Sequence, residues 1–200
     1  MRPLVMDDLL PLAEYAARRR EFFDSHRQYL ERHRRVRIGP SVTLVFENRQ
    51  TMWFRVQEIV RIARLTATEV IQRELDLCNR LLPSVGRLQA SLLIELDEAS
   101  LSSELERWQS LRGDQILMHI GNTSIPADLL TCRPEDRCAG TAYWVQFAVA
   151  VAHADMLRKA TPPVHFEIAA QAYAHISKPV PSSIRTSLAD DLDMSARDAA

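Results

Sequence analysis

Three polar residues on two predicted strands have the types and spacing for metal or acid–base chemistry. His119 lies on one predicted strand, and His165 and Glu167 lie on another. Each alternates with apolar residues, so each side chain is expected on the face opposite the buried stripe. If the two strands approach one another, the imidazoles and the carboxylate form a metal-binding or acid–base cluster, with His175 as a further candidate. A solvated sheet face explains the same pattern equally well.

Two cysteines, Cys132 and Cys138, bracket a charged loop with five residues between them. A metal site would need two further ligands, and this spacing differs from that of zinc knuckles, so ordinary free thiols are favoured. The sequence has no nucleophile elbow, phosphate loop or dinucleotide fingerprint, and its 5 glycines are too few to build such loops. We therefore expect no catalytic residue, metal ligand or cofactor in this chain.

Arginines are concentrated between Arg18 and Arg37. Acidic residues interrupt this band and no aromatic pattern accompanies it, which disfavours a nucleic acid partner. A solvated helix face is the simplest interpretation. The second is a local anion site for an acidic peptide or a partner subunit, and its candidates are Arg34, Arg35 and Arg37.

The composition indicates one well-filled domain in a reducing compartment. The chain has 200 residues, of which 46% are hydrophobic, and its net charge is -1. No run of eighteen apolar residues is present, so no membrane span or membrane partner is expected. The 3 cysteines and the absence of a long apolar stretch after Met1 favour a cytoplasmic location.

Residues 36–83 are predicted to form a strand and two helices that carry several of the polar residues considered as binding-site candidates. Alternating apolar residues predict a strand ending at Phe46, and apolar residues then recur at helical spacing as far as Leu82. Thr66-Ala67-Thr68-Glu69 has the form of a capping box, which divides this pattern into helices at 51–65 and 67–81. On that interpretation, Thr66→Ala costs about 1 kcal/mol of stability.

The remaining pattern predicts an α+β fold with a mostly antiparallel sheet and long helices packed on one face. A first helix is expected from Asp7 or Asp8 to about Arg34. Further strands are expected at 88–96, 116–120, 141–149 and 164–168, helices at 98–111 and 154–160, and irregular structure at 123–139. We expect one domain over residues 1–176 and a mobile or docking tail over residues 177–200, which are rich in Pro, Ser, Asp and Ala.

The central segment also resembles a known bacterial family. The shared residues are Gly39-Pro40, Val42-Thr43-Leu44, Phe46-Glu47-Asn48-Arg49, Thr51, Gln57-Glu58, Arg61, Asn79-Arg80-Leu81-Leu82-Pro83 and the strand from Leu88 to Glu95. On these residues the chain resembles domain-of-unknown-function family 3501, whose genes are often neighbours of rubrerythrin and iron–sulfur oxidoreductase genes. The resemblance implies iron or redox surroundings. It also implies a buried or interfacial network in which Glu47, Gln57, Glu58 and Arg61 join the strand end to the helix.

Two departures from the family pattern favour binding over catalysis. Ala63 stands where the family usually has an acidic residue, and alanines and a glutamine precede Tyr173 where an Asp-His-Pro pattern is typical. The resemblance therefore implies an accessory subunit that holds the substrate, or completes the active site, of an iron-dependent enzyme, with the iron in the partner. A more specific similarity is to the small partner subunit of a multinuclear iron oxidase of the 3-thiaglutamate type, which modifies a carrier peptide. The alternative is a stand-alone metal or redox enzyme that uses the histidine cluster.

An acidic carrier peptide or partner tail is expected to add to the sheet as one more strand beside Val42–Phe46. Arg34, Arg35 and Arg37 come just before that strand and would pair with acidic side chains of the peptide. The affinity of such a contact is expected to fall as salt is added.

Overall fold

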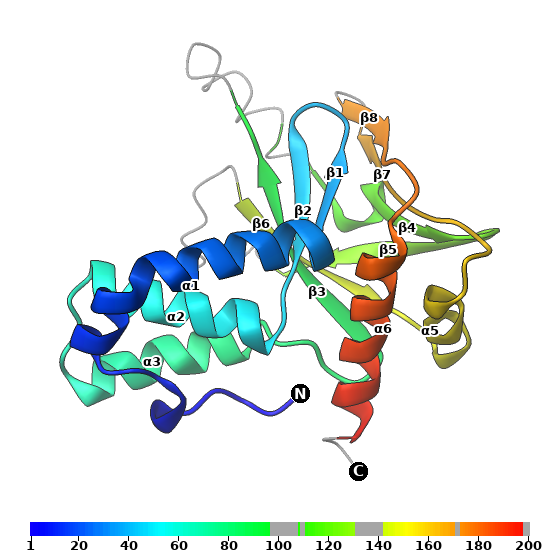
Figure 1. The fold of residues 1–200 in the computed structure, drawn as a ribbon. Helices are drawn as coiled ribbons and strands as arrows, with labels where there is room; N and C mark the ends of the chain where they lie inside the picture. The colour runs from blue at the N-terminus through cyan, green and yellow to red at the C-terminus, as the bar shows by residue number, and fades with distance from the viewer. Residues whose placement is uncertain (97–107, 109–110, 131–141, 171–172, 198–200) are drawn as a thin grey trace.

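An antiparallel sheet of eight strands organises the fold (Figure 1). The computed structural model describes residues 1–96, 108, 111–130, 142–170 and 173–197. The strands are β1 (Arg35–Ile38), β2 (Val42–Phe46), β3 (Arg87–Ile94), β4 (Ile116–Ile120), β5 (Thr123–Leu129), β6 (Ala142–Ala148), β7 (Val164–Ala170) and β8 (Tyr173–Ile176). The α-helices are α1 (Leu12–His33), α2 (Arg49–Ile62), α3 (Thr68–Asn79), α5 (Val151–Arg158) and α6 (Ser182–Arg197). Short 3-10 turns lie at Met6–Asp8 and Gly113–Gln115.

The sheet curves until its two edge strands meet. Its order is β1-β2-β3-β6-β5-β4-β7-β8, so β1 and β8 are the edges. The Tyr173 hydroxyl on β8 donates to the Ile38 carbonyl on β1 at 2.6 Å and accepts from the Ser41 amide at 3.0 Å. Gly39 turns the chain between β1 and β2 with a φ of 65°, and a Cβ there would lie 2.5 Å from the Tyr173 hydroxyl. Only glycine fits both the turn and this contact, so Gly39 helps to close the sheet.

Strand alternation places one continuous core on the inner face of the sheet. Buried apolar side chains alternate along β4, β6 and β7, as the sequence pattern predicted. At the centre, the Phe166 ring lies 5.2 Å from the Phe46 ring and 5.4 Å from the Phe147 ring, measured between centroids. These strands are therefore held by the burial of large aromatic side chains, each of which contributes strongly to the hydrophobic effect.

Helices lie on both sides of this sheet. The outer face of β2, β3 and β6 carries Val45, Ser91 and Trp144, and α1, α2 and α3 lie over it (Figure 1). A second apolar cluster joins α2 to α3 through Val56 and Leu75 among others. The predicted α+β class, with a mostly antiparallel sheet and long helices on one face, is confirmed. In the part of the chain that is described, no helix is both long enough and apolar enough to cross a membrane.

Helix α6 lies within residues 177–200, for which the sequence predicted a mobile or docking tail. Ile184, Leu188 and Leu192 are buried in the main core, on the side of the sheet opposite α2. They recur every four residues, so they form one stripe of the helix. Polar and small residues surround this stripe, so the amino-acid composition of the segment did not indicate an amphipathic helix. The segment therefore packs against the core of its own domain.

Two other expectations need correction, and two more concern residues that the structure does not describe. Strand β2 is paired with β1 on one side and β3 on the other, so it offers no free edge to a peptide. Residues 123–129, expected to be irregular, form β5, which pairs with β6 only from Ala127 onward and so tolerates Pro126. The predicted helix at 98–111 and the loop of Cys132 and Cys138 fall largely or wholly outside the described residues.

The two predicted helices of the central segment are confirmed, but their capping is different. No side chain caps α3, whose N-cap is Ala67, so the predicted box at Thr66 is absent. Arg64, with a φ of 50°, ends the preceding turn instead. The real cap is Asn48 of α2, whose side-chain oxygen accepts from the Gln50 and Thr51 amides at 3.1 Å each.

We therefore expect Asn48→Ala to lower the free energy of unfolding by at least about 1–2 kcal/mol, because it removes the helix cap and also the hydrogen bond from the Asn48 side-chain amide to the Tyr29 hydroxyl. Thr66→Ala serves as the matched control, because Thr66 is exposed and caps nothing, and it is expected to leave the stability within about 0.5 kcal/mol of wild type. Urea melts followed by circular dichroism measure both. A larger loss for Thr66→Ala than for Asn48→Ala would show that the cap is assigned to the wrong helix.

Candidate binding site

A cavity of about 320 Å³ lies between α1, α2 and the outer face of the sheet. We call it the α1–α2 cavity. Helix α1 supplies His26 and Leu30, and the sheet supplies Arg35, Val45, Ser91 and Leu93. The strand end and α2 supply Glu47, Thr51, Phe54, Arg55, Glu58, Ile59 and Ile62. Its size is at the lower end of the range for ligand pockets, and its mixture of apolar walls with a few polar groups is typical of them.

Glu47 forms the polar floor of the cavity. Its side chain is only 2% exposed, because β2 ends there and the chain turns directly into α2. The carboxylate accepts from the Thr51 hydroxyl at 2.5 Å, the Ser91 hydroxyl at 2.6 Å and the Arg55 guanidinium at 2.9 Å. The guanidinium of Arg55 lies over the Trp144 ring at 4.7 Å from its centroid. A buried carboxylate with three donors is satisfied, so Glu47 holds β2, β3 and α2 together.

Glu58 is a second carboxylate whose oxygens are fully engaged. It accepts from Tyr15 at 2.9 Å, from Arg19 at 3.0 Å and from Arg61 at 2.9 Å. Burial by itself raises the pKa of this carboxyl, but the hydrogen bonds from Arg61, Arg19 and Tyr15 outweigh burial and lower the pKa to about 2. Glu58 is therefore a stable anion at neutral pH and joins α1 to α2.

His26 is a neutral aromatic wall of the cavity. Its ring stacks on Phe54 with a centroid distance of 3.9 Å. Burial, followed by the positive charges of Arg55 and Arg35, lowers the pKa of His26 to about 4. The Nδ1 atom of His26 and the Nε atom of Arg35 are both buried and have no hydrogen-bond partner. These two nitrogen atoms therefore have unused hydrogen-bonding capacity in the wall of the cavity.

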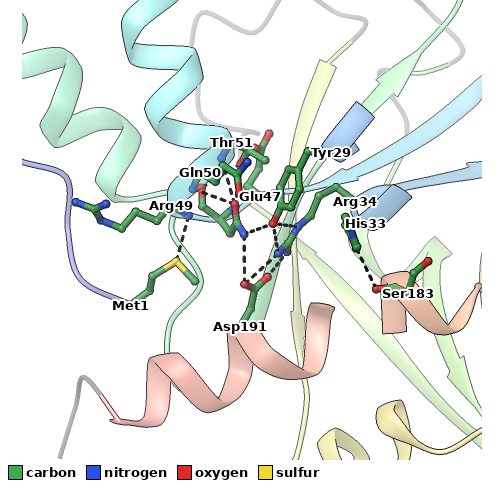
Figure 2. Close-up of polar contacts among 11 residues, drawn as sticks. Met1, Tyr29, His33, Arg34, Glu47, Arg49, Gln50, Thr51, Ser183 and Asp191 are labelled. Carbon is green, nitrogen blue, oxygen red and sulfur yellow. Dashed lines mark hydrogen bonds and ion pairs between the residues drawn. The ribbon is translucent and has the colours of Figure 1, made fainter. Parts of the chain in front are cut away.

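Arg34 lies outside this cavity, in a buried ion pair with Asp191 of α6 (Figure 2). Its guanidinium also donates to the Tyr29 hydroxyl at 2.6 Å, and that hydroxyl accepts from Asn48 at 2.9 Å. The side chains of Arg34 and Asp191 are only 3% and 4% exposed. Burial raises the pKa of Asp191, and the adjacent Arg34 opposes that rise. This network anchors α6, so Arg34 is a structural residue.

The structure brings together only part of the predicted site. Arg35, Glu47 and Glu58 line the α1–α2 cavity, and Arg61 supports it through Glu58. Gln57 is 1% exposed and does not line the cavity, and its Nε2 atom has no hydrogen-bond partner. The side chain of Arg37 is 59% exposed and contacts the Pro40 carbonyl and Glu95.

Sequence reasoning missed His26, Phe54, Arg55 and Ser91 as residues of one site. Arg55 stands one helical turn after Thr51, and Ser91 lies in the polar phase of β3, so both signals were visible. Each was compatible with a solvated face. Only the crossing of α1 over α2, which is not encoded in either periodicity, places them around one cavity.

The predicted histidine cluster forms only in part. His119 and His165 are direct partners across β4 and β7. The Nε2 atom of His119 lies 2.6 Å from Glu167, and its Nδ1 atom lies 2.9 Å from the Ser124 hydroxyl, while His165 contacts the Ser177 carbonyl. Among the described residues, no three His, Cys, Asp or Glu side chains are arranged to hold a metal ion.

Comparison with known proteins places the chain in a family. The sequence matches the family described as Protein of unknown function (DUF3501) over residues 3–192. The chain belongs to this family. The fold is similar to the crystal structure of a protein of unknown function from Burkholderia pseudomallei, with a TM-score of 0.86 and 25% sequence identity over 96% of this chain and 100% of that one. None of the curated proteins compared with the sequence matches it.

The DUF3501 residues recognised in the sequence act mainly as connectors. Asn48 caps α2, and Glu47 joins β2 to β3 and α2. Asn79 at the end of α3 holds the N-terminal segment, because its side chain accepts from the Leu4 amide at 2.8 Å and donates to the Leu4 carbonyl at 2.9 Å. Ala63, one of the departures from the family pattern, is the C-cap of α2 and is exposed. Among the shared residues, Glu47, Thr51 and Glu58 line the α1–α2 cavity, as do Ser91 and Leu93 of the shared strand, whereas Asn48 and Asn79 hold elements outside it.

Proposed function

We propose that this protein is a cytoplasmic, non-catalytic subunit that binds a substrate or a carrier peptide for an iron-dependent oxidative enzyme. The observation that carries the proposal is the α1–α2 cavity, in which the oxygens of both acidic residues are already engaged by donors of the protein. Glu58, with a pKa of about 2, and Glu47, with three donors, are poor candidates for a general base. Apolar walls beside fixed charges suit recognition rather than proton transfer.

The identity of the partner rests on the redox surroundings that the family resemblance implies. A multinuclear iron oxidase that modifies a carrier peptide fits these surroundings, and the iron then belongs to the partner. The cavity would hold a segment of the substrate while the partner carries out the oxidation. This division of roles agrees with the two departures from the family pattern at Ala63 and before Tyr173.

A pocket-blocking variant tests this proposal. Leu93 lines the cavity and is 38% exposed, so Leu93→Trp is expected to fill the mouth without opening the core. Leu77→Trp on α3 is the matched control, because Leu77 is 52% exposed and does not line the cavity. Affinity purification from the native cell should recover an iron-containing enzyme with wild type and with Leu77→Trp, but not with Leu93→Trp. Equal recovery with all three proteins would show that the cavity is not the binding site.

A second candidate function is a stand-alone metal or redox enzyme that uses His119 and Glu167, whose Nε2 and carboxylate atoms lie 2.6 Å apart. Metal analysis separates the two functions. An accessory subunit purified alone is expected to hold well under one equivalent of iron or zinc. A stoichiometric metal that is lost in His119→Ala or His165→Ala would favour the enzyme instead.

A further inference from the structure

In the α1–α2 cavity the carboxylates are engaged by donors of the protein, whereas the guanidinium groups keep unused N–H donors. The oxygens of Glu47 and Glu58 are engaged by Thr51, Ser91, Arg55, Tyr15, Arg19 and Arg61. Arg35 contacts Glu31 through one terminal nitrogen, and its Nε has no partner. Arg55 uses one terminal nitrogen for Glu47 and Ser91. A guanidinium has five N–H donors, so the hydrogen-bonding capacity left unused in this cavity belongs to donors, and it lies on the two arginines of a lining that also holds two engaged glutamates.

The environment of His26 reflects the same two arginines. Its position beside Arg55 and Arg35 disfavours protonation, in addition to the effect of burial. The neutral imidazole therefore adds an aromatic wall and no charge at neutral pH. An anionic group that enters the cavity would lie between two guanidinium groups and against the stacked rings of His26 and Phe54.

The mouth of the cavity is apolar. Ile62 is 68% exposed and Leu93 is 38% exposed, and both line the cavity. Phe23, which is 42% exposed, lies beside Phe54 with ring centroids 6.4 Å apart. A free small acid would fill the interior and leave this apolar rim in water. A peptide with apolar residues on both sides of an acidic residue would cover the interior and the rim together.

Another cavity also has arginine nitrogens without a hydrogen-bond partner, on Arg49, but differs in its charges. It has a volume of about 610 Å³ and lies between the N-terminal segment, the start of α2 and α6. Its acidic residues Asp8, Asp190 and Asp191 are paired with Arg49, Arg158 and Arg34 respectively. Its lining carries these three aspartates and only two arginines, Arg34 and Arg49, so it is less favourable to an anion than the α1–α2 cavity.

We propose that the α1–α2 cavity takes the side-chain carboxylate of an acidic residue flanked by apolar residues in a partner peptide. Arg35 and Arg55 receive the carboxylate, and Phe23, Ile62 and Leu93 contact the flanking residues. This inference rests on the proposed function and adds the chemistry of the recognised segment. It also revises the arginine set expected from sequence, because Arg34 is buried against Asp191 and Arg37 lies outside the cavity.

Three probes test the proposal by titration against the full chain, followed by amide chemical shifts in NMR. They are an acetylated, amidated pentapeptide with glutamate between two leucine pairs, the same peptide with glutamine, and free butyrate. The glutamate peptide is expected to bind about tenfold or more tightly than the glutamine peptide, because it adds charge-assisted hydrogen bonds. Butyrate is expected to bind more weakly than the glutamate peptide, because it leaves the rim uncovered.

Two arginine variants complete the test. Arg35→Gln is expected to remove most of the preference for glutamate, while Arg37→Gln, two residues along the same strand and outside the cavity, keeps it. Equal affinity for the two peptides, equal effects of the two variants, or butyrate binding as tightly as the glutamate peptide would each overturn the inference. Such a result leaves the proposed function to the separate test with Leu93→Trp, which uses the natural partner and no assumed ligand chemistry.

Discussion

Asp191→Ala is expected to lower the free energy of unfolding by about 3–5 kcal/mol, the usual cost of breaking a buried ion pair. The reason is that the variant leaves the charged side chain of Arg34 in place. Arg34 is 2% exposed, and without Asp191 its guanidinium would stay buried with the Tyr29 hydroxyl as its one described side-chain partner. A buried charge without a counter-ion is far more costly than the loss of one hydrogen bond. Urea melts measure the change, and hydrogen exchange of α6 amides reports whether this helix is released first.

The neighbouring residue Asp190 provides the matched control. Its side chain is 57% exposed and pairs with Arg158 on the surface, so Asp190→Ala is expected to change stability by less than about 1 kcal/mol. The double variant Arg34→Met/Asp191→Leu removes both charges and should recover much of the loss. Similar effects of Asp190→Ala and Asp191→Ala would argue against a buried anchor between α1 and α6.

Lowering the pH from about 5 toward 2 is expected to remove about 3 kcal/mol of stability that Glu58 contributes. The pKa of Glu58 falls from an ordinary value of 4.5 to about 2 in the folded protein. The unfolded chain therefore takes up the proton first as the pH falls. The contribution is fully present above pH 4.5 and is lost as the pH falls through this interval. Because the Glu58 side chain is only 15% exposed, solvent screening removes little of it.

The measurement is the stability of wild type and Glu58→Gln from pH 7 to 2. The difference between the two curves should shrink below pH 4.5, and Glu58→Gln should be the less stable protein at pH 7. His26 acts in a higher interval, because its lowered pKa makes stability fall between pH 6.5 and 4 in both proteins. Glu21→Gln, which alters a fully exposed pair with Arg18, is the control. Parallel curves for wild type and Glu58→Gln would exclude Glu58 as an anchor between α1 and α2.

The sequence by itself determined the local elements and the family. The two central helices, most strands and the α+β class follow from periodicities that neighbouring residues carry within one element. The resemblance also pointed to Glu47 and Glu58, and each accepts hydrogen bonds from a residue a few positions along the chain, Thr51 and Arg61 respectively. Local patterns failed at Thr66, where the residue types of a capping box were present but the chain ends α2 with Arg64 in a left-handed conformation and gives α3 no side-chain cap.

Only the tertiary structure distinguishes the environments of Arg34, Arg35 and Arg37. Arg34 pairs with Asp191, 157 residues away, and no pattern within a helix or a strand records such a contact. Alternation along β1 puts Arg35 and Arg37 in the same phase, yet only Arg35 lies where α1 and α2 cross the sheet. One of these arginines thus anchors a helix, one lines the cavity and one lies on the surface. Which environment each receives depends on how the helices pack over the sheet, and that packing is set by the shapes of side chains distant in sequence.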